Sequence, residues 1–180
     1  MPRYAAFLRG VNLASRRKAS SADLRSCFEG IGFDAVETFR TSGNVVFDAD
    51  RESRTKLTGR IEQALAKSLG FDVTVFVRTS QELQAIAASQ PFPAKLVEAS
   101  QGKLQVSMLS MKPAAAVRKG VLALATEEDR LAFGDRELYW LPSGGTRDSA
   151  LNLKAVEKRL GAWTMRTKGT VELVAAKYFA

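Results

Sequence analysis

Histidine is absent from the 180 residues of this chain. Its absence excludes every mechanism that needs imidazole: Ser-His-Asp and Cys-His catalysis, His-ligated zinc, and a histidine acid or base that titrates near neutral pH. The single cysteine, Cys27, can form neither an internal disulfide nor a site with several thiolate ligands. We therefore expect a protein that holds no metal and needs no cofactor.

Long apolar runs are missing as well. The N-terminal stretch, residues 1–9, has only a few apolar residues before a charge, too few for a signal peptide or a membrane span. We expect a cytoplasmic protein without a membrane partner. The composition is otherwise that of an ordinary globular protein, 46% hydrophobic and 26% charged, which suffices for one sizeable core or two small subdomains.

Basic side chains outnumber acidic ones, 27 to 19, for a formal net charge of +8. The acidic residues are interspersed along the chain, which is typical of a charged surface rather than of a basic tail. The exception is Arg16-Arg17-Lys18, which lies in a Ser-rich stretch. The charge balance indicates an anionic partner, either a small molecule or a nucleic acid.

The first half of the chain follows the order β-α-β-β-α-β. Residues 4–9 alternate as a strand does, and Leu24, Cys27, Phe28 and Ile31 occupy one face of a helix that stops at Gly32. β-Branched and aromatic runs over 35–40 and 44–48 predict a hairpin, residues 55–69 predict a second helix, and 73–77 predict a strand. This order is the split βαβ arrangement of a ferredoxin-like plait.

The second half repeats the same order of elements. After a short helix over 81–88, strands are predicted at 103–109, 131–133, 137–141 and 163–166, with helices after Pro113, over 149–160 and from 170 onwards. The predicted fold class is α+β: two tandem ferredoxin-like plaits, βαββαβ twice, with appended helices. The predicted subdomains are 1–79 and 103–180, joined by a helical linker over 80–102.

Three segments stand out: Leu8-Arg9-Gly10-Val11-Asn12 with the basic loop after it, Ser42-Gly43-Asn44-Val45-Val46-Phe47, and Thr164-Met165-Arg166 before a closing helix. Together they resemble the bacterial family known as domain of unknown function 1697. The likeness extends over essentially the whole chain. It implies a pair of α-β plaits and brings no activity, substrate or cofactor with it.

The chain departs from the family pattern in two places. Ala14 and Ser15 replace the glycine pair of the loop that follows Asn12, which weakens the case for a backbone cradle there. Near the C-terminus, residues 164–170 keep threonine, arginine and threonine but lack the family's two asparagines and its tryptophan.

Cationic and amide side chains cluster at predicted strand ends and loops beside the start of the first helix. Exposed N–H groups and the positive end of the helix dipole would add to them, which suits a phosphate or a carboxylate. Two further arginines join the site if the plaits face one another. The candidate ligand-binding residues are Arg9, Asn12, Arg16, Lys18, Ser42, Asn44, Arg147 and Arg166.

An alternative interpretation is that Asn12 and Asn44 serve turns and that the arginines form a solvated rim. An RNA-recognition sheet is disfavoured, because residues 42–47 contain one aromatic and the adjacent Tyr139 and Trp140 must point to opposite faces. Two further functions stay open: an enzyme that acts on a small phosphorylated or carboxylated substrate without histidine, and a protein interaction module.

Overall fold

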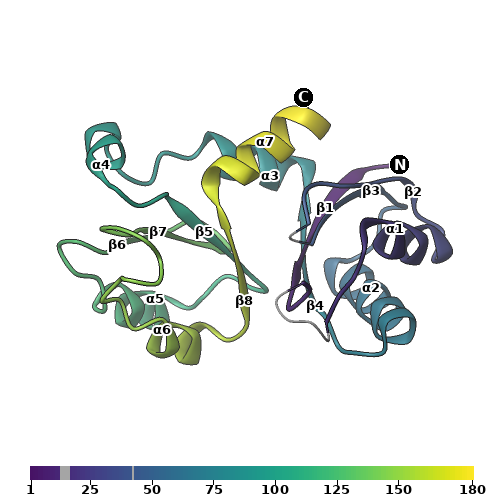
Figure 1. Cartoon of the computed structure of the whole chain (residues 1–180), viewed down its shortest axis with the longest axis horizontal. Coiled ribbons are helices and arrows are strands. Elements are labelled where there is room, and N and C mark those ends of the chain that lie inside the picture. The colour runs from purple at the N-terminus through teal and green to yellow at the C-terminus, as the bar shows by residue number, and fades with distance from the viewer. Residues whose placement is uncertain (13–16, 42) are drawn as a thin grey trace. The chain divides into compact units, whose positions relative to one another are not determined.

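The computed structural model describes residues 1–12, 17–41 and 43–180 (Figure 1). Two predicted site residues, Arg16 and Ser42, lie outside these ranges. The chain divides into two compact units. The first comprises Met1–Gln84 and Val174–Ala180, and the second comprises Ala85–Leu173. Over the described residues the fold is mixed α+β, with two four-stranded antiparallel sheets and seven helices.

The elements of the first unit are β1 (Arg3–Arg9), α1 (Ser21–Gly30), β2 (Asp34–Thr38), β3 (Asn44–Asp48), α2 (Arg54–Leu69) and β4 (Thr74–Thr79). Its sheet has the strand order β2-β3-β1-β4, with every neighbouring pair antiparallel. In the register of this sheet Phe7 pairs with Asn44, and Arg9 pairs with Thr74. The predicted hairpin and both predicted helices of this half are confirmed.

Helices α1 and α2 cover the same face of this sheet (Figure 1). Leu24, Cys27 and Phe28 of α1 meet the inward residues of the strands in one buried core, as the helical spacing predicts. Arg60 of α2 joins the two helices: its guanidinium pairs with Glu52 and donates to the carbonyl of Ile31, at the end of α1.

The C-terminal segment Val174–Ala180 belongs to the first unit although it follows the second unit in the sequence. Gln84 Nε2 donates to the carbonyl of Phe179 at 2.6 Å, and Arg3 Nη1 donates to the carbonyl of Tyr178 at 3.4 Å. The Tyr178 ring also packs edge-on against Phe39, with 6.2 Å between ring centroids. The end of α7 (Lys168–Tyr178) is thereby held against the strands of this unit.

The elements of the second unit are β5 (Gln105–Leu109), α5 (Ala115–Leu122), β6 (Arg130–Phe133), β7 (Glu137–Leu141), α6 (Leu153–Leu160) and β8 (Trp163–Thr167). This unit repeats the topology of the first, with the strand order β6-β7-β5-β8. Helices α5 and α6 lie on one face of its sheet (Figure 1). Trp140 is buried in the core on this face, so the adjacent Tyr139 points the other way.

Two short helices lie between the sheets in sequence, α3 (Ser80–Ala88) and α4 (Ala94–Ala99). The first is confirmed at the predicted position. The second follows Pro93 and was not predicted, because its six residues bury no side chain and so carry no helical periodicity. Among the described residues, none of these helices combines the length and the apolar character needed to cross a bilayer.

Candidate functional site

A pocket of about 480 Å³ opens beside the N-terminal end of α1. We call it the α1 pocket. Three segments form its described walls: the loop between β1 and α1, the first turn of α1, and the turn between β2 and β3. This volume falls in the range of small-molecule binding sites. Its lining residues are Asn12, Lys18, Ala19, Ser20, Ser21, Leu24, Arg40 and Thr41.

Asn12 joins two of these walls. Its side-chain Nδ2 donates to the carbonyl of Thr41 at 2.6 Å and to the carbonyl of Ala19 at 3.1 Å. Its Oδ1 accepts from the backbone N–H of Ala19 at 3.0 Å. The residue has a positive φ of 58°, a conformation that asparagine tolerates better than most residues. Asn12 therefore holds the loop to the β2–β3 turn, in line with the turn interpretation of this residue.

The first turn of α1 is closed by a capping box. Ser20 Oγ accepts from the backbone N–H of Asp23, and the Asp23 carboxylate accepts from the backbone N–H of Ser20. The Ser20 hydroxyl also donates to Asp23 Oδ2 at 2.7 Å, and this bond, followed by the one from the Ser20 backbone N–H, holds the pKa of the Asp23 carboxyl below its usual range. The backbone N–H groups of Ser21 and Ala22 have no acceptor inside the helix, because they belong to its first turn. Ser21 lines the pocket, so its N–H and the positive end of the helix dipole lie beside it.

Among the residues that the structure describes, two cationic side chains line the α1 pocket. Lys18 lies in the loop before α1 and is exposed, and Arg40 is exposed in the β2–β3 turn. Arg40 has a positive φ of 58° and its guanidinium carbon lies 5.3 Å from the centroid of the Phe39 ring. Sequence reasoning missed Arg40. Its one signal was its position immediately before the turn residues of the predicted hairpin.

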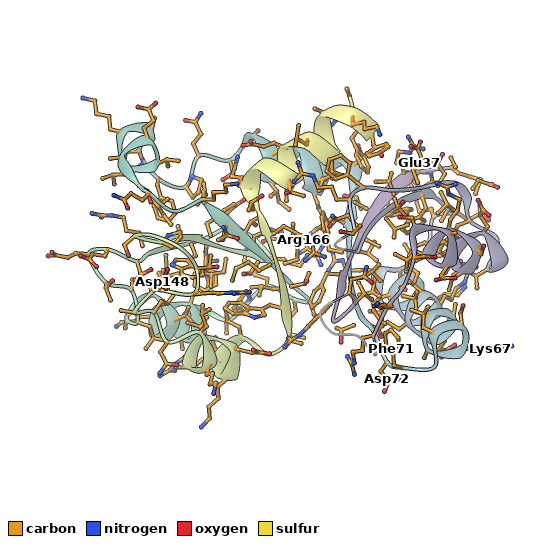
Figure 2. All side chains as sticks on the ribbon, in the orientation of Figure 1. Glu37, Lys67, Phe71, Asp72, Asp148 and Arg166 are labelled. Carbon is orange, nitrogen blue, oxygen red and sulfur yellow. The ribbon has the colours of Figure 1, made fainter. Side chains whose placement is uncertain are left out.

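Arg17, in the same basic loop, contacts the ring of Phe71. Its guanidinium carbon is 5.4 Å from the centroid of the Phe71 ring. Figure 2 shows Phe71 and Asp72 in the turn between α2 and β4. Arg17 is exposed and lies outside the described lining of the pocket. The cation–π contact orients this side chain toward the end of α2.

Arg9 and Asn44 lie on the strands behind this loop. Arg9 is half-buried at the end of β1, and the alternation along the strand places it on the face opposite Leu8, whose side chain enters the helix-covered core. Asn44 is buried at the start of β3, where its Nδ2 donates to the carbonyl of Phe39 at 2.9 Å. The Phe39 N–H donates in return to the Asn44 carbonyl, so Asn44 closes the hairpin.

Arg147 and Arg166 belong to the second unit. Arg147 is exposed in the loop between β7 and α6, the loop that also carries the labelled Asp148 in Figure 2. Arg166 lies on β8, where its Nη1 donates to Thr164 Oγ1 at 2.9 Å and to the Met165 carbonyl at 2.8 Å. Burial lowers the pKa of Arg166 to about 10, which leaves the guanidinium charged at neutral pH.

The arrangement in the first unit can hold an anion. Lys18 and Arg40 supply positive charge, the first turn of α1 supplies N–H donors, and Leu24 with Ala19 supplies apolar surface. The residues that the structure describes include no group of three or more His, Cys, Asp or Glu side chains that could hold a metal ion. The charged side chains in the described lining of the pocket are thus both basic.

The structure thus defines an α+β protein of two similar units, with a basic pocket in the first. The chain belongs to the family described as "Protein of unknown function (DUF1697)", whose profile matches residues 1–139. That match includes the β1–α1 loop and the β2–β3 turn and ends before residues 164–166. None of the curated proteins matches this chain.

A solved structure has a similar fold. The "conserved bacterial protein SP0830 from Streptococcus pneumoniae" superposes on this chain with a TM-score of 0.76 and 22% sequence identity. The similarity covers 98% of this chain and 97% of the other. At this identity the likeness shows the fold, which includes both units.

Proposed function

We propose that this protein binds a small anionic ligand, phosphorylated or carboxylated, in the α1 pocket. The observation that carries the proposal is the presence of Lys18 and Arg40 on two walls of one pocket at the start of α1. Each comes from a different segment, and Asn12 ties those segments together. Because this hydrogen bond already holds the two segments together, little backbone ordering is needed when a ligand binds to the two cationic side chains.

The ligand chemistry follows from the donors. A phosphate or carboxylate group would accept hydrogen bonds from the N–H groups of Ser21 and Ala22 and would neutralise Lys18 and Arg40. The apolar side chain of Leu24 would contact the carbon skeleton of the ligand. The limited volume of the pocket favours a small molecule over a nucleic acid, whose backbone needs an extended basic surface.

We further propose that each unit contains a ferredoxin-like plait, the first within the subdomain 1–79 and the second within the subdomain 103–180, joined by a helical linker over 80–102. The two sheets support this proposal, because β2-β3-β1-β4 and β6-β7-β5-β8 are the same order of equivalent strands. The element order β-α-β-β-α-β also occurs in both units. Such a repeat would make the α1 pocket the specialised feature of the first plait.

A thermal-shift screen tests the proposed function. Inorganic phosphate, sugar phosphates, nucleotides, dicarboxylates, short RNA and short DNA are added to the full chain, and the unfolding temperature is measured. We expect one of the small anions to raise it, and K18A/R40A to abolish the rise. R51A/K67A removes the same number of exposed charges from the first unit away from the pocket and should keep it.

Two results would remove the proposal: a rise that survives in K18A/R40A, and a flat response to every small anion. A response confined to RNA and DNA would replace the small ligand with a nucleic acid.

A further inference from the structure

A second concave surface lies on the second unit, along α5. It has a volume of about 440 Å³ and is lined by Lys112, Pro113, Ala115, Arg118, Lys119 and Leu122. We call it the α5 groove. It is separate from the α1 pocket in sequence and in fold, since all of its lining residues belong to the second unit. The proposed function makes no use of it.

The charges of the α5 groove have one sign. All three charged lining residues are cationic: Lys112, Arg118 and Lys119. Arg118 is held in place, because its guanidinium carbon lies 5.1 Å from the centroid of the Phe133 ring. The groove therefore presents a cationic rim in which one side chain is already positioned.

The neighbouring Asp135 shows how this rim acts on a carboxylate. Its Oδ1 lies 3.0 Å from Lys112 Nζ, and both side chains are more than half exposed. The hydrogen bond from Lys112, together with the charges of Lys112, Arg136 and Arg118, holds the pKa of the Asp135 carboxyl below its usual range. An exposed pair of this kind is weak and exchanges readily with a carboxylate from another molecule.

The floor of the groove is apolar. Its apolar lining residues are Pro113, Ala115 and Leu122, and Leu122 is 41% exposed; the 72% exposed Met111 precedes Lys112 in the chain and lies outside the lining. Only four large apolar side chains among the described residues are strongly exposed, and Leu122 and Met111 are two of them. An apolar floor with a cationic rim is complementary to a segment that carries both apolar and acidic side chains.

The geometry points to the α5 groove as a docking site for an acidic, apolar-bearing segment of another protein. Carboxylates of that segment pair with Lys112, Arg118 and Lys119, and an apolar side chain covers Leu122. A nucleic acid is the poorer fit, because its phosphates would satisfy the rim and leave Leu122 uncovered. The proposal concerns an interaction surface and is independent of the ligand in the α1 pocket.

Selection from a random peptide library on the immobilised full-length protein tests this proposal. We expect enrichment of peptides that combine Asp or Glu with Leu, Ile or Phe. Fluorescence anisotropy of a labelled enriched peptide then measures its affinity. R118E/K119E should weaken binding about tenfold, and L122S by about threefold to tenfold, since both the rim and the floor contribute.

R51E/K67E is the matched control, because it makes the same change in charge in the first unit. Both residues are exposed, and Figure 2 shows Lys67 extending away from α2. It should leave the peptide affinity unchanged, and circular dichroism should show that all variants are folded.

Four results would overturn the proposal. They are an absence of enrichment, equal weakening by R51E/K67E, indifference to L122S, and tighter Arg118-dependent binding of a short DNA duplex than of any selected peptide.

Discussion

Gly43 supports the turn that brings Arg40 and Thr41 to the α1 pocket. It has a positive φ of 72°, and its carbonyl accepts from the backbone N–H of Leu8 at 2.8 Å. A Cβ at this position would lie 2.6 Å from Val11 Cγ2 and 2.9 Å from Leu8 Cβ. Both neighbours are buried in the core, so neither can move aside freely. We therefore predict that Gly43→Ala is strongly destabilising.

The size of the effect follows from two contributions. An alanine in the left-handed region costs about 1–2 kcal/mol, because Cβ approaches its own carbonyl oxygen. Forcing a methyl group into packed side chains costs about 1–3 kcal/mol more. The free energy of unfolding should thus fall by roughly 2–5 kcal/mol in total.

Gly32 provides the control for the steric contribution. Its φ of 83° is also positive, but a Cβ there would meet no atom within 4 Å. Gly32→Ala should therefore cost only the backbone contribution of about 1–2 kcal/mol. Urea unfolding followed by far-ultraviolet circular dichroism measures both variants. Equal losses in the two, or a loss for Gly43→Ala below about 1 kcal/mol, would refute the packing argument.

Three further predictions concern the first unit. Asn12→Asp places a carboxylate against the two carbonyls to which the Asn12 amide now donates. The free energy of unfolding, measured in urea, should therefore fall by about 2–4 kcal/mol. An unchanged stability would contradict the role of Asn12 as a link between the pocket walls. Ser20→Ala removes the cap of α1 and should cost about 1 kcal/mol at neutral pH. The pKa of Asp23 is lowered in the folded protein, so the contribution of this carboxylate to stability is present above the ordinary pKa of 3.8 and is lost as the pH falls through the folded pKa. The difference in stability between wild type and Ser20→Ala should therefore shrink in acid. A difference that grows in acid would contradict this direction. Burial raises the pKa of the Cys27 thiol, so a thiol reagent should react slowly with the native protein and quickly in urea, whereas rapid native labelling would contradict the buried position.

Most of the fold could be predicted because the spacing of apolar residues follows the helical period and the strand period clearly in this chain. Helix α2 shows how: Leu57, Ile61 and Leu65 are its buried residues, four apart, and Gly70 ends it. Helix α6 begins at Leu153, later than predicted, because the residues before its Asn152 cap form a loop in which Ser149 Oγ donates to Asp129 Oδ1 at 2.6 Å. Hydrogen bonds between distant segments of this kind leave no periodic signal in a sequence.

The candidate site was predictable only in part. Lys18 was found because basic residues before a predicted helix are conspicuous, and it does line the α1 pocket. Asn12 donates to the carbonyl of the distant Thr41, and Asn44 donates to the carbonyl of Phe39 across the hairpin. Neither hydrogen bond can be inferred from residue type alone. Arg40 was missed because its access to the pocket depends on a left-handed turn conformation, which arginine rarely adopts.

An NMR titration of the isotope-labelled protein with inorganic phosphate and with a phosphomonoester is the most direct test of anion binding at the start of α1. We predict saturable shifts concentrated at the backbone amides of Ser21, Ala22 and Thr41, and their loss in K18A/R40A. Saturable shifts centred outside the α1 pocket, or no saturable shift at these three amides, would contradict the account.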